Sequence, residues 1–231
     1  MRDAAVTFVT GTDTDVGKTI TTAALAAALS ANGATVAVYK PTQTGVLPGG
    51  HGDADEVARL SGVGTVREGI RLRDPMAPVA AAMRENRRLP TVQDHVECIW
   101  ELSGSFDHVL VEGAGGLLVE LDAQGNTLAD VAAEAGDIAR TGFVVTCRSG
   151  LGTLNHTALT LEALRHRGVP SPALVVGSWP VAPSDIDLSN RKSLQALGTP
   201  FLGSLPEGAA LLDPQVFQRM AAEWLALPSW T

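Results

Sequence analysis

Short apolar, β-branched runs alternate with longer segments of helical periodicity along almost the whole chain. The apolar runs are continuous, which is typical of strands buried on both faces of a parallel sheet. They predict strands at 4–10, 34–39, 107–112, 141–146, 172–177 and 200–204. The segments between them predict helices at 17–31, 53–61, 91–103, 127–135, 151–167, 186–197 and 213–226. This alternation indicates an α/β fold with three layers and a doubly wound, mostly parallel sheet.

The pattern is least regular between residues 62 and 90, where glycines and prolines are frequent. The charged cluster at 84–88 in this region is typical of a solvated helix end. No internal repeat, low-complexity tract or linker divides the chain. We therefore expect a single domain over residues 1–231.

The first predicted strand and helix are joined by Gly11-Thr12-Asp13-Thr14-Asp15-Val16-Gly17-Lys18-Thr19. A loop ending in Gly-Lys-Thr at this place is typical of a phosphate-binding loop, whose backbone N–H groups face the anion. Lys18 would reach the β and γ phosphates, and the hydroxyl of Thr19 would hold a magnesium ion. The usual spacing has a glycine where this chain has Thr12. The alternative is a strand-to-helix turn with a chance lysine, but the strand before the loop and the helix after it favour the nucleotide site.

Lys40 ends the second predicted strand, in the segment Lys40-Pro41-Thr42-Gln43-Thr44-Gly45. Only three of the 17 basic residues are lysines, namely Lys18, Lys40 and Lys192, so each suggests a place that needs a compact ammonium. Open α/β sheets bind ligands at the carboxyl ends of their strands. We therefore expect Lys40 and Thr44 to face the same ligand as the phosphate loop, with a mere solubility role for Lys40 as the alternative.

Two acidic residues are candidates for a metal site. Glu112 ends a predicted strand and precedes Gly113-Ala114-Gly115-Gly116, the position of a Walker-B-type carboxylate that binds magnesium directly or through water. The small residues after it allow a ligand to approach the backbone closely. Asp53 opens the helix at 53–61, and it could either cap that helix or place a carboxylate near the phosphates. The sequence leaves both readings of Asp53 open.

The composition argues against several classes of partner. A net charge of −8 disfavours nucleic acid or an anionic membrane surface as the main partner. The first residues do not combine a basic segment with an apolar one, and no apolar run is long enough to cross a bilayer. The two cysteines, Cys98 and Cys147, suit neither a disulfide framework nor a zinc cluster. We therefore expect a cytoplasmic protein.

Taken together, G-T-D-T-D-V-G-K-T, K-P-T-Q-T-G, the aspartate at 53, V-E-G-A-G-G and L-G-T-L-N-H resemble the dethiobiotin synthetase family. The resemblance implies a P-loop NTPase-like fold and a ligase of biotin biosynthesis that closes the ureido ring of dethiobiotin. Its substrates would be 7,8-diaminononanoate, CO2 or bicarbonate, and a nucleoside triphosphate, with ATP as co-substrate and Mg2+ as cofactor. A carbamate would form, take up the γ phosphate and be closed by the second amine with release of phosphate. The helix start at 151–155 resembles an element that binds the substrate carboxylate across the interface of a homodimer.

The resemblance also implies roles for single residues. Lys18 and Lys40 would be catalytic, and Thr19, Asp53 and Glu112 would hold the metal. The nucleotide would be bound by Asp15, Val16, Gly17, Lys18, Thr19, Ile20, Asp53, Glu112, Gly113, Ala114, Gly115, Gly177, Ser178, Pro206, Glu207 and Gly208. The substrate would contact Thr14, Lys40, Thr44, Gly115, Gly116, Leu151 and Asn155.

One segment departs from the family pattern. Many members have an asparagine that reads adenine shortly after the strand at 172–177, and the stretch 177–183 contains none. The base would then be held by backbone groups and by the turn at 205–208, and triphosphates other than ATP could serve.

The alternative function is that of a partition- or septum-type ATPase switch, which shares this style of loop. Such proteins usually carry a lysine early in the loop, where this chain has Thr12. They also tend to have a basic surface or an amphipathic C-terminal helix. The last predicted helix contains only Arg219 as a base, so core packing explains its apolar residues better.

Overall fold

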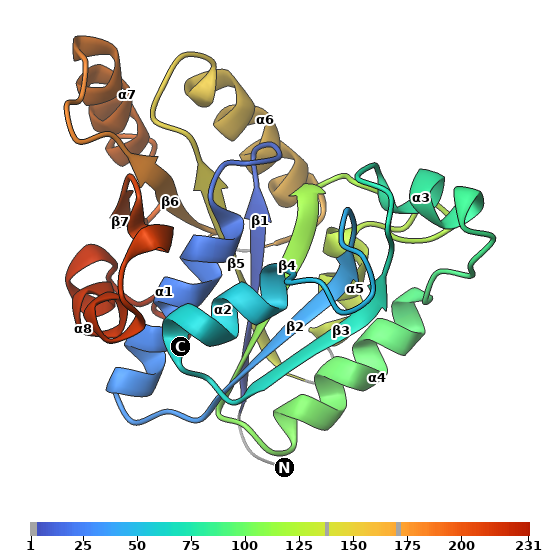
Figure 1. Cartoon of the computed structure of the whole chain (residues 1–231). Helices are drawn as coiled ribbons and strands as arrows, with labels where there is room; N and C mark the ends of the chain where they lie inside the picture. Colours follow the sequence, from blue (N-terminus) through green and yellow to red (C-terminus); the bar gives the residue numbers. More distant parts are fainter. Residues whose placement is uncertain (1–3, 137–138, 170–171) are drawn as a thin grey trace.

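The computed structural model of the protein describes residues 4–136, 139–169 and 172–231. Within these residues, seven strands form one sheet in the order β3-β2-β4-β1-β5-β6-β7, with every neighbouring pair parallel (Figure 1). The strands are β1 (Ala5–Gly11), β2 (Val36–Gln43), β3 (Thr65–Arg71), β4 (His108–Gly116), β5 (Arg140–Cys147), β6 (Ala173–Trp179) and β7 (Phe201–Pro206). The α/β prediction is confirmed, and the single domain expected over 1–231 stays a prediction.

Helices cover both faces of the sheet (Figure 1). They are α1 (Lys18–Ala31), α2 (Asp53–Ser61), α3 (Pro78–Arg84), α4 (Val92–Ser103), α5 (Leu128–Ala135), α6 (Thr153–His166), α7 (Asp185–Gln195) and α8 (Pro214–Trp224), with a short 3-10 turn at Ala209–Leu211. The helices α1, α2 and α8 pack on one face, and α4, α5 and α6 pack on the other with α7 beside α6. No helix in the described part of the chain is both long and apolar enough to cross a membrane.

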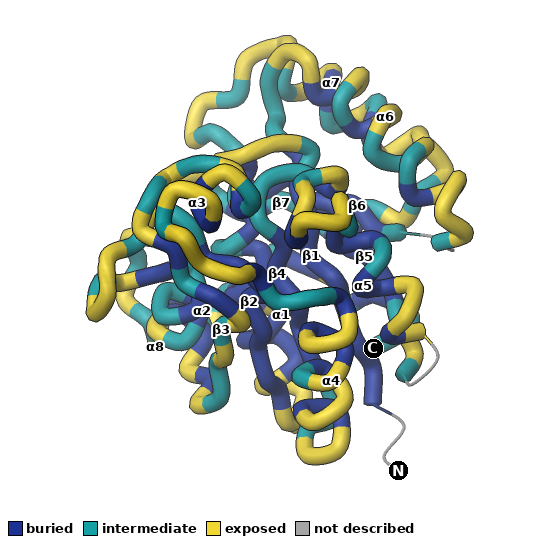
Figure 2. The backbone as a smooth tube through the Cα atoms, turned by 90° about the vertical axis from the view of Figure 1, so that its right-hand side faces the viewer, coloured by how far each residue is buried: buried dark blue, intermediate teal, exposed yellow. Residues whose placement is uncertain are grey.

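The strands are apolar on both faces because each face supports its own hydrophobic core. In β2, Val36 and Val38 join the core under α1, α2 and α8, whereas Ala37 and Tyr39 join the core on the opposite face. Figure 2 shows the result, with buried strands inside and exposed positions concentrated on the outer helices and loops. This is the burial that continuous apolar runs predict.

The segment 62–90 contains β3 and α3, which the apolar pattern does not predict. β3 is an edge strand, paired with β2 alone, and it contains three charged residues, a threonine and a glycine but only two apolar residues. Charges on an edge strand prevent pairing with other chains, so such a strand lacks the continuous apolar signal. α3 is only seven residues long and ends at the exposed Arg84, in agreement with the helix end expected at 84–88.

Candidate active site

The register of the sheet brings Lys40 and Glu112 together. β2 and β4 pair so that Tyr39 lies opposite Val111, and the next residues along the two strands are Lys40 and Glu112. Because side chains alternate along a strand, both point away from the core that contains Tyr39 and Val111, towards the face covered by α1 and α2. The first residues of those helices therefore meet the two strand ends.

The loop between β1 and α1 has the geometry of a phosphate-binding turn. Asp15 and Gly17 both have left-handed backbone conformations, with φ of 56° and 96°. The loop is attached to β5 by the N–H of Thr12, which donates to the carbonyl of Thr146 at 2.9 Å. The Lys18 ammonium folds back over the loop and donates to the carbonyl of Asp13 at 3.0 Å. The α1 N-terminus thus presents free N–H groups and an ammonium to one point, which suits an anion.

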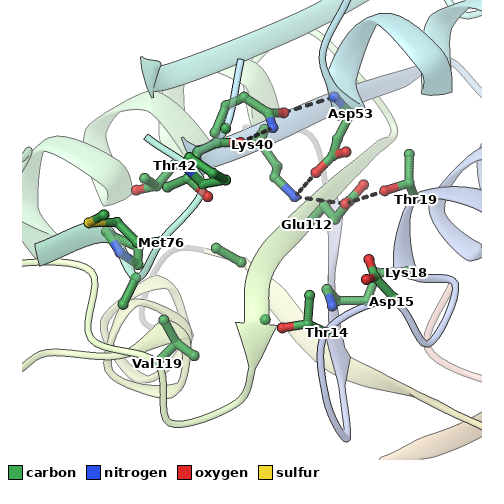
Figure 3. A pocket seen from close by; sticks show the side chains of 18 of the residues that line it. Thr14, Asp15, Lys18, Thr19, Lys40, Thr42, Asp53, Met76, Glu112 and Val119 are labelled. Atoms are coloured by element: carbon green, nitrogen blue, oxygen red, sulfur yellow. Dashed lines mark hydrogen bonds and ion pairs between the residues drawn. The ribbon is translucent and has the colours of Figure 1, made fainter. Parts of the chain in front are cut away.

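Lys40, Glu112, Asp53 and Thr19 form one polar cluster (Figure 3). The Lys40 Nζ lies 2.6 Å from Asp53 Oδ2 and 2.7 Å from Glu112 Oε1, and it donates to the Gly113 carbonyl at 3.1 Å. The Thr19 hydroxyl donates to Glu112 Oε1 at 2.9 Å. Lys40 and Glu112 are buried, with side chains 3% and 1% exposed. The cluster combines residues from β2, β4 and the starts of α1 and α2.

Asp53 does not cap its own helix. The carboxylate of Asp55 accepts a hydrogen bond from the N–H of Gly52, the residue before the helix, at 2.8 Å. The N–H of Asp53 donates instead to the side-chain oxygen of Gln43 at 2.8 Å. Both N–H groups at the helix start therefore have side-chain acceptors other than Asp53. The Asp53 carboxylate points instead to the Lys40 ammonium. Of the two readings that the sequence leaves open, the structure does not support capping.

The two lysines of the site have opposite pKa shifts. Burial lowers the pKa of Lys18, and the nearby Lys40 charge lowers it further. Burial also opposes the charge of Lys40, but the carboxylates of Glu112 and Asp53 outweigh it and raise the pKa of Lys40. Lys40 is therefore charged at neutral pH.

The oxygen atoms of the cluster fit a magnesium ion. Glu112 Oε2 is buried and accepts no hydrogen bond. Thr19 Oγ1 and Glu112 Oε1 are 2.9 Å apart, close to the ~2.9 Å between adjacent ligands of an octahedral ion with bonds of about 2.05 Å. The described part of the chain contains no group of three or more acidic, histidine or cysteine side chains that could hold a metal ion. Magnesium suits such a set because it takes one or two carboxylates and completes its shell with phosphate and water.

A cavity of about 860 Å³ opens beside this cluster. Most of the predicted residues of the phosphate loop and of the strand ends line it. From the sequence predictions, the lining residues are Thr14, Asp15, Gly17, Lys18, Thr19, Ile20, Lys40, Thr44, Asp53, Glu112, Ala114 and Gly115. The volume is within the usual range for sites that hold small molecules.

Comparisons with known proteins identify the family of the chain. A family model described as an AAA domain matches residues 6–215. The ATP-dependent dethiobiotin synthetase BioD of Streptomyces coelicolor is 51% identical, covering 96% of this chain and 92% of that protein. The protein of the same name from Rhodococcus jostii is 48% identical, covering 95% of this chain and 94% of that protein. This chain belongs to the family of ATP-dependent dethiobiotin synthetases.

Solved structures of other proteins share the fold. The MinC:MinD cell division complex of Aquifex aeolicus matches with a TM-score of 0.54 at 13% identity, covering 94% of this chain and 86% of that chain. The cell division protein FtsY of Thermotoga maritima matches with a TM-score of 0.53 at 16% identity, covering 96% and 69%. At such low identity these likenesses show the P-loop NTPase-like fold alone. The septum-type alternative therefore gains no functional support, whereas the dethiobiotin synthetase relatives match in sequence over nearly their whole length.

Other residues that the family resemblance predicts lie outside the cavity. Val16 and Gly113 are buried behind its wall, and Gly116 pairs with Gly11 between β4 and β1. Gly177 lies directly beneath the phosphate loop, where an added Cβ would be 2.0 Å from the Val16 carbonyl. It therefore supports the loop of this dethiobiotin synthetase through backbone packing.

Two further groups of predicted residues are separate from the cavity. The ends of β6 and β7 bring Ser178 close to 206–208, where the Glu207 N–H donates to the Trp179 carbonyl at 2.7 Å. Leu151 and Asn155 are exposed at the start of α6. The base-binding role of the first group and the substrate-binding role of the second stay predictions.

Part of the cavity wall was missed by the sequence reasoning. Thr42 and Gln43 of β2, Gly45, Val119 and the segment 75–78 line it as well, and Figure 3 shows Met76 and Val119 across the cavity from the phosphate loop. Two backbone hydrogen bonds fix the chain just before residues 75–78. The Gly45 N–H donates to the Asp74 carbonyl, and the Leu72 N–H donates to the Gln43 carbonyl. A proline-rich stretch directly after a strand was the available signal for this wall.

Proposed function

We propose that this chain closes the ureido ring of dethiobiotin from 7,8-diaminononanoate, CO2 and a nucleoside triphosphate. The observation that carries the proposal is the Lys40 ammonium between Asp53 and Glu112 beside a phosphate-binding loop. A lone phosphate loop would suit many NTPases. A buried second lysine beside the phosphate site suits an anionic acceptor that attacks the γ phosphate.

The reaction has three steps. One amine of the substrate adds to CO2 and loses a proton to solvent, which gives a carbamate anion. A carbamate oxygen then attacks the γ phosphorus and the nucleoside diphosphate leaves, giving a carbamic–phosphoric mixed anhydride. The second amine attacks the carbonyl carbon and loses a proton to solvent or to the departing phosphate, the C–O bond to phosphate breaks, and inorganic phosphate leaves with the closing of the ring.

The residues of the site contribute charge and position to these steps. Lys18 and the N–H groups of the loop neutralise the β and γ phosphates as charge moves towards the leaving oxygen. Lys40 binds and orients the carbamate anion, and Thr44 holds the diamine at the cavity edge. Thr14 and the turn at 115–116 complete the substrate side.

Thr19, Asp53 and Glu112 would hold Mg2+, and Asp15–Ile20 with Gly113–Gly115 would surround the triphosphate. When bound, the metal ion would neutralise phosphate charge. The unpartnered Glu112 Oε2 supports this assignment.

The base would be held by Ser178 and Pro206–Gly208 at the adjacent ends of β6 and β7, whereas Gly177 supports the phosphate loop beside them. Because that region offers backbone groups and no asparagine amide, we propose that ATP is the co-substrate but that other triphosphates compete with it. Competition binding of ATP, CTP and GTP tests this, and a strong preference for ATP alone would refute it.

We also propose a homodimer in which Leu151 and Asn155 bind the carboxylate of a substrate held by the partner. Three leucines of this region, Leu151, Leu154 and Leu159, are 77%, 39% and 57% exposed, and Figure 2 shows how much of α6 faces solvent. An apolar face of this kind favours association with a second copy. The mass in solution, measured for the wild type and for Leu151→Asp, tests the interface.

The activity is tested by phosphate release with and without the diamine. We expect release to depend on the diamine and Lys40→Ala to lower turnover more than nucleotide affinity. Diamine-independent release at the full rate would refute the ligase, and normal turnover of Lys40→Ala would remove Lys40 from the mechanism. The cytoplasmic location stays a prediction.

A further inference from the structure

The Lys40 ammonium has no free hydrogen-bond donor. A lysine ammonium has three N–H groups. Those of Lys40 are matched by three acceptors, namely Asp53 Oδ2 at 2.6 Å, Glu112 Oε1 at 2.7 Å and the Gly113 carbonyl at 3.1 Å. To contact a carbamate, Lys40 must therefore give up at least one of these partners.

The two carboxylates on Lys40 are also the ones proposed to hold the metal. Their oxygens both lie within 2.7 Å of one nitrogen, so they are no more than about 5 Å apart. A divalent cation that bridges these two oxygens must displace the ammonium, and one bound through the free Glu112 Oε2 would lie close enough for the two positive charges to repel each other strongly. The buried position makes the competition strong, since charges at low dielectric interact much more than in water.

Lys18 is placed differently although it lies in the same cavity. Its ammonium donates to a main-chain carbonyl, that of Asp13, at 3.0 Å. A neutral acceptor is given up more readily than a carboxylate. Lys18 can therefore turn to a phosphate directly, whereas Lys40 is held by two negative charges.

We propose that Lys40 serves as an exchangeable counter-ion, which occupies the metal carboxylates until a divalent cation arrives with the nucleotide and is then released towards the carbamate. Release needs little movement, because Lys40 lines the same cavity as Thr44 and Gly115. The exchange also keeps free divalent cations off the carboxylates, and it rests on the metal site proposed above.

The first test measures Mn2+ binding to nucleotide-free protein by electron paramagnetic resonance. We expect Lys40→Gln to bind Mn2+ about tenfold or more tightly than the wild type, because a unit charge next to the two carboxylates is removed. Lys40→Arg, which keeps the charge, should not gain affinity. Lys192→Gln, which removes an exposed lysine of α7, is the matched control. Equal Mn2+ affinity of Lys40→Gln and wild type would overturn the proposal.

The second test uses the wild-type protein, so it does not depend on the folding of a variant. The chain has only three lysines, so 15N labelling of lysine side chains gives three Nζ resonances. We expect a non-hydrolysable triphosphate with Mg2+ to shift the Lys40 resonance, and the same triphosphate with EDTA to leave it near its starting position. A Lys40 resonance that does not respond to Mg2+ would contradict the exchange.

The metal site can fail separately from the exchange. Asp53→Asn and Glu112→Gln should weaken Mn2+ binding in the presence of nucleotide if these residues hold the metal. If both variants weaken Mn2+ binding and Lys40→Gln gains no affinity for Mn2+ without nucleotide, only the proposed exchange is wrong. If neither variant weakens Mn2+ binding, the metal assignment is wrong, and so is the exchange that depends on it.

Discussion

Gly177→Ala is expected to displace the phosphate loop. An added Cβ at this position of β6 would lie 2.0 Å from the Val16 carbonyl oxygen and 2.5 Å from Thr146 Cγ2. Ordinary contacts of a Cβ atom are 3.4–4 Å long, so the separation from Val16 must increase by about 1.4 Å. Thr146 belongs to the central part of the sheet, whereas Val16 belongs to a loop. The loop is therefore the part that moves.

The size of the effect follows from the displacement. A misplacement of about 1 Å can cost about 10²-fold in rate when it affects groups that position a substrate. We therefore expect kcat/KM to fall by about 100-fold, equivalent to ~2.7 kcal/mol of transition-state stabilisation. Overpacking should also lower the free energy of unfolding by about 1–3 kcal/mol. Gly64→Ala is the matched control, because a Cβ there meets no atom within 4 Å and the backbone is not left-handed.

The assay compares calorimetric binding of ATP with that of inorganic tripolyphosphate. If the loop moves, Gly177→Ala should weaken both ligands by a similar factor, and Gly64→Ala should change neither. A direct contact of Gly177 with the base would give a different result, in which affinity for ATP changes and affinity for tripolyphosphate does not. That outcome would refute the steric reasoning and support the role expected from the sequence.

Three other perturbations test separate parts of the molecule. Lys18→Met should lower turnover by about 10²–10³-fold through loss of phosphate stabilisation, with Lys192→Met unchanged in a phosphate-release assay. Gln43→Met should raise the Mg2+ concentration for half-maximal activity, because the Gln43 side-chain oxygen accepts a hydrogen bond from the Asp53 N–H at 2.8 Å. An unchanged Mg2+ dependence of Gln43→Met would exclude this positioning role. Burial lowers the pKa of His95 to about 4 from 6.5, so the unfolded chain binds more protons between these values and the free energy of unfolding falls by up to about 3 kcal/mol as the pH is lowered through that window. Urea unfolding at several pH values checks this, and His95→Gln should flatten the profile.

The parts of the fold that could be predicted are those with local signals. A strand covered on both faces is apolar along most of its length, so β1, β4 and β5 were recognisable from residue type alone. β3 was not, because Arg67, Glu68 and Arg71 occupy an edge where ion pairs replace apolar contacts. Such a strand is specified by its pairing with β2, which no local pattern reports.

The same distinction applies to the site. The phosphate loop, Lys40 and Glu112 were predictable because ligands of parallel sheets bind where strands end. The prolines at 75 and 78 indicate a turn, but the position of this wall beside the cavity was not predictable, since it depends on hydrogen bonds between two loops, such as that from the Gly45 N–H to the Asp74 carbonyl. The packing of Gly177 under Val16 is likewise a contact between distant parts of the chain. The sequence could not decide whether Asp53 caps its helix or faces the ligand. The structure bears on this because the Asp55 carboxylate, not that of Asp53, accepts the hydrogen bond from the Gly52 N–H before the helix.

The charges of the polar cluster explain why nucleotide and metal should bind together. Lys18 and Lys40 carry two positive charges, and Asp53 and Glu112 carry two negative ones, so these four side chains nearly cancel. They offer little net attraction to a triphosphate with about four negative charges, and the N–H groups at the start of α1 contribute only about half a unit charge. A divalent cation that arrives with the triphosphate halves its charge and meets two carboxylates. If Lys40 is exchanged in that step, its ammonium becomes available for an anionic acceptor next to the γ phosphate, which a fixed ion pair would not allow.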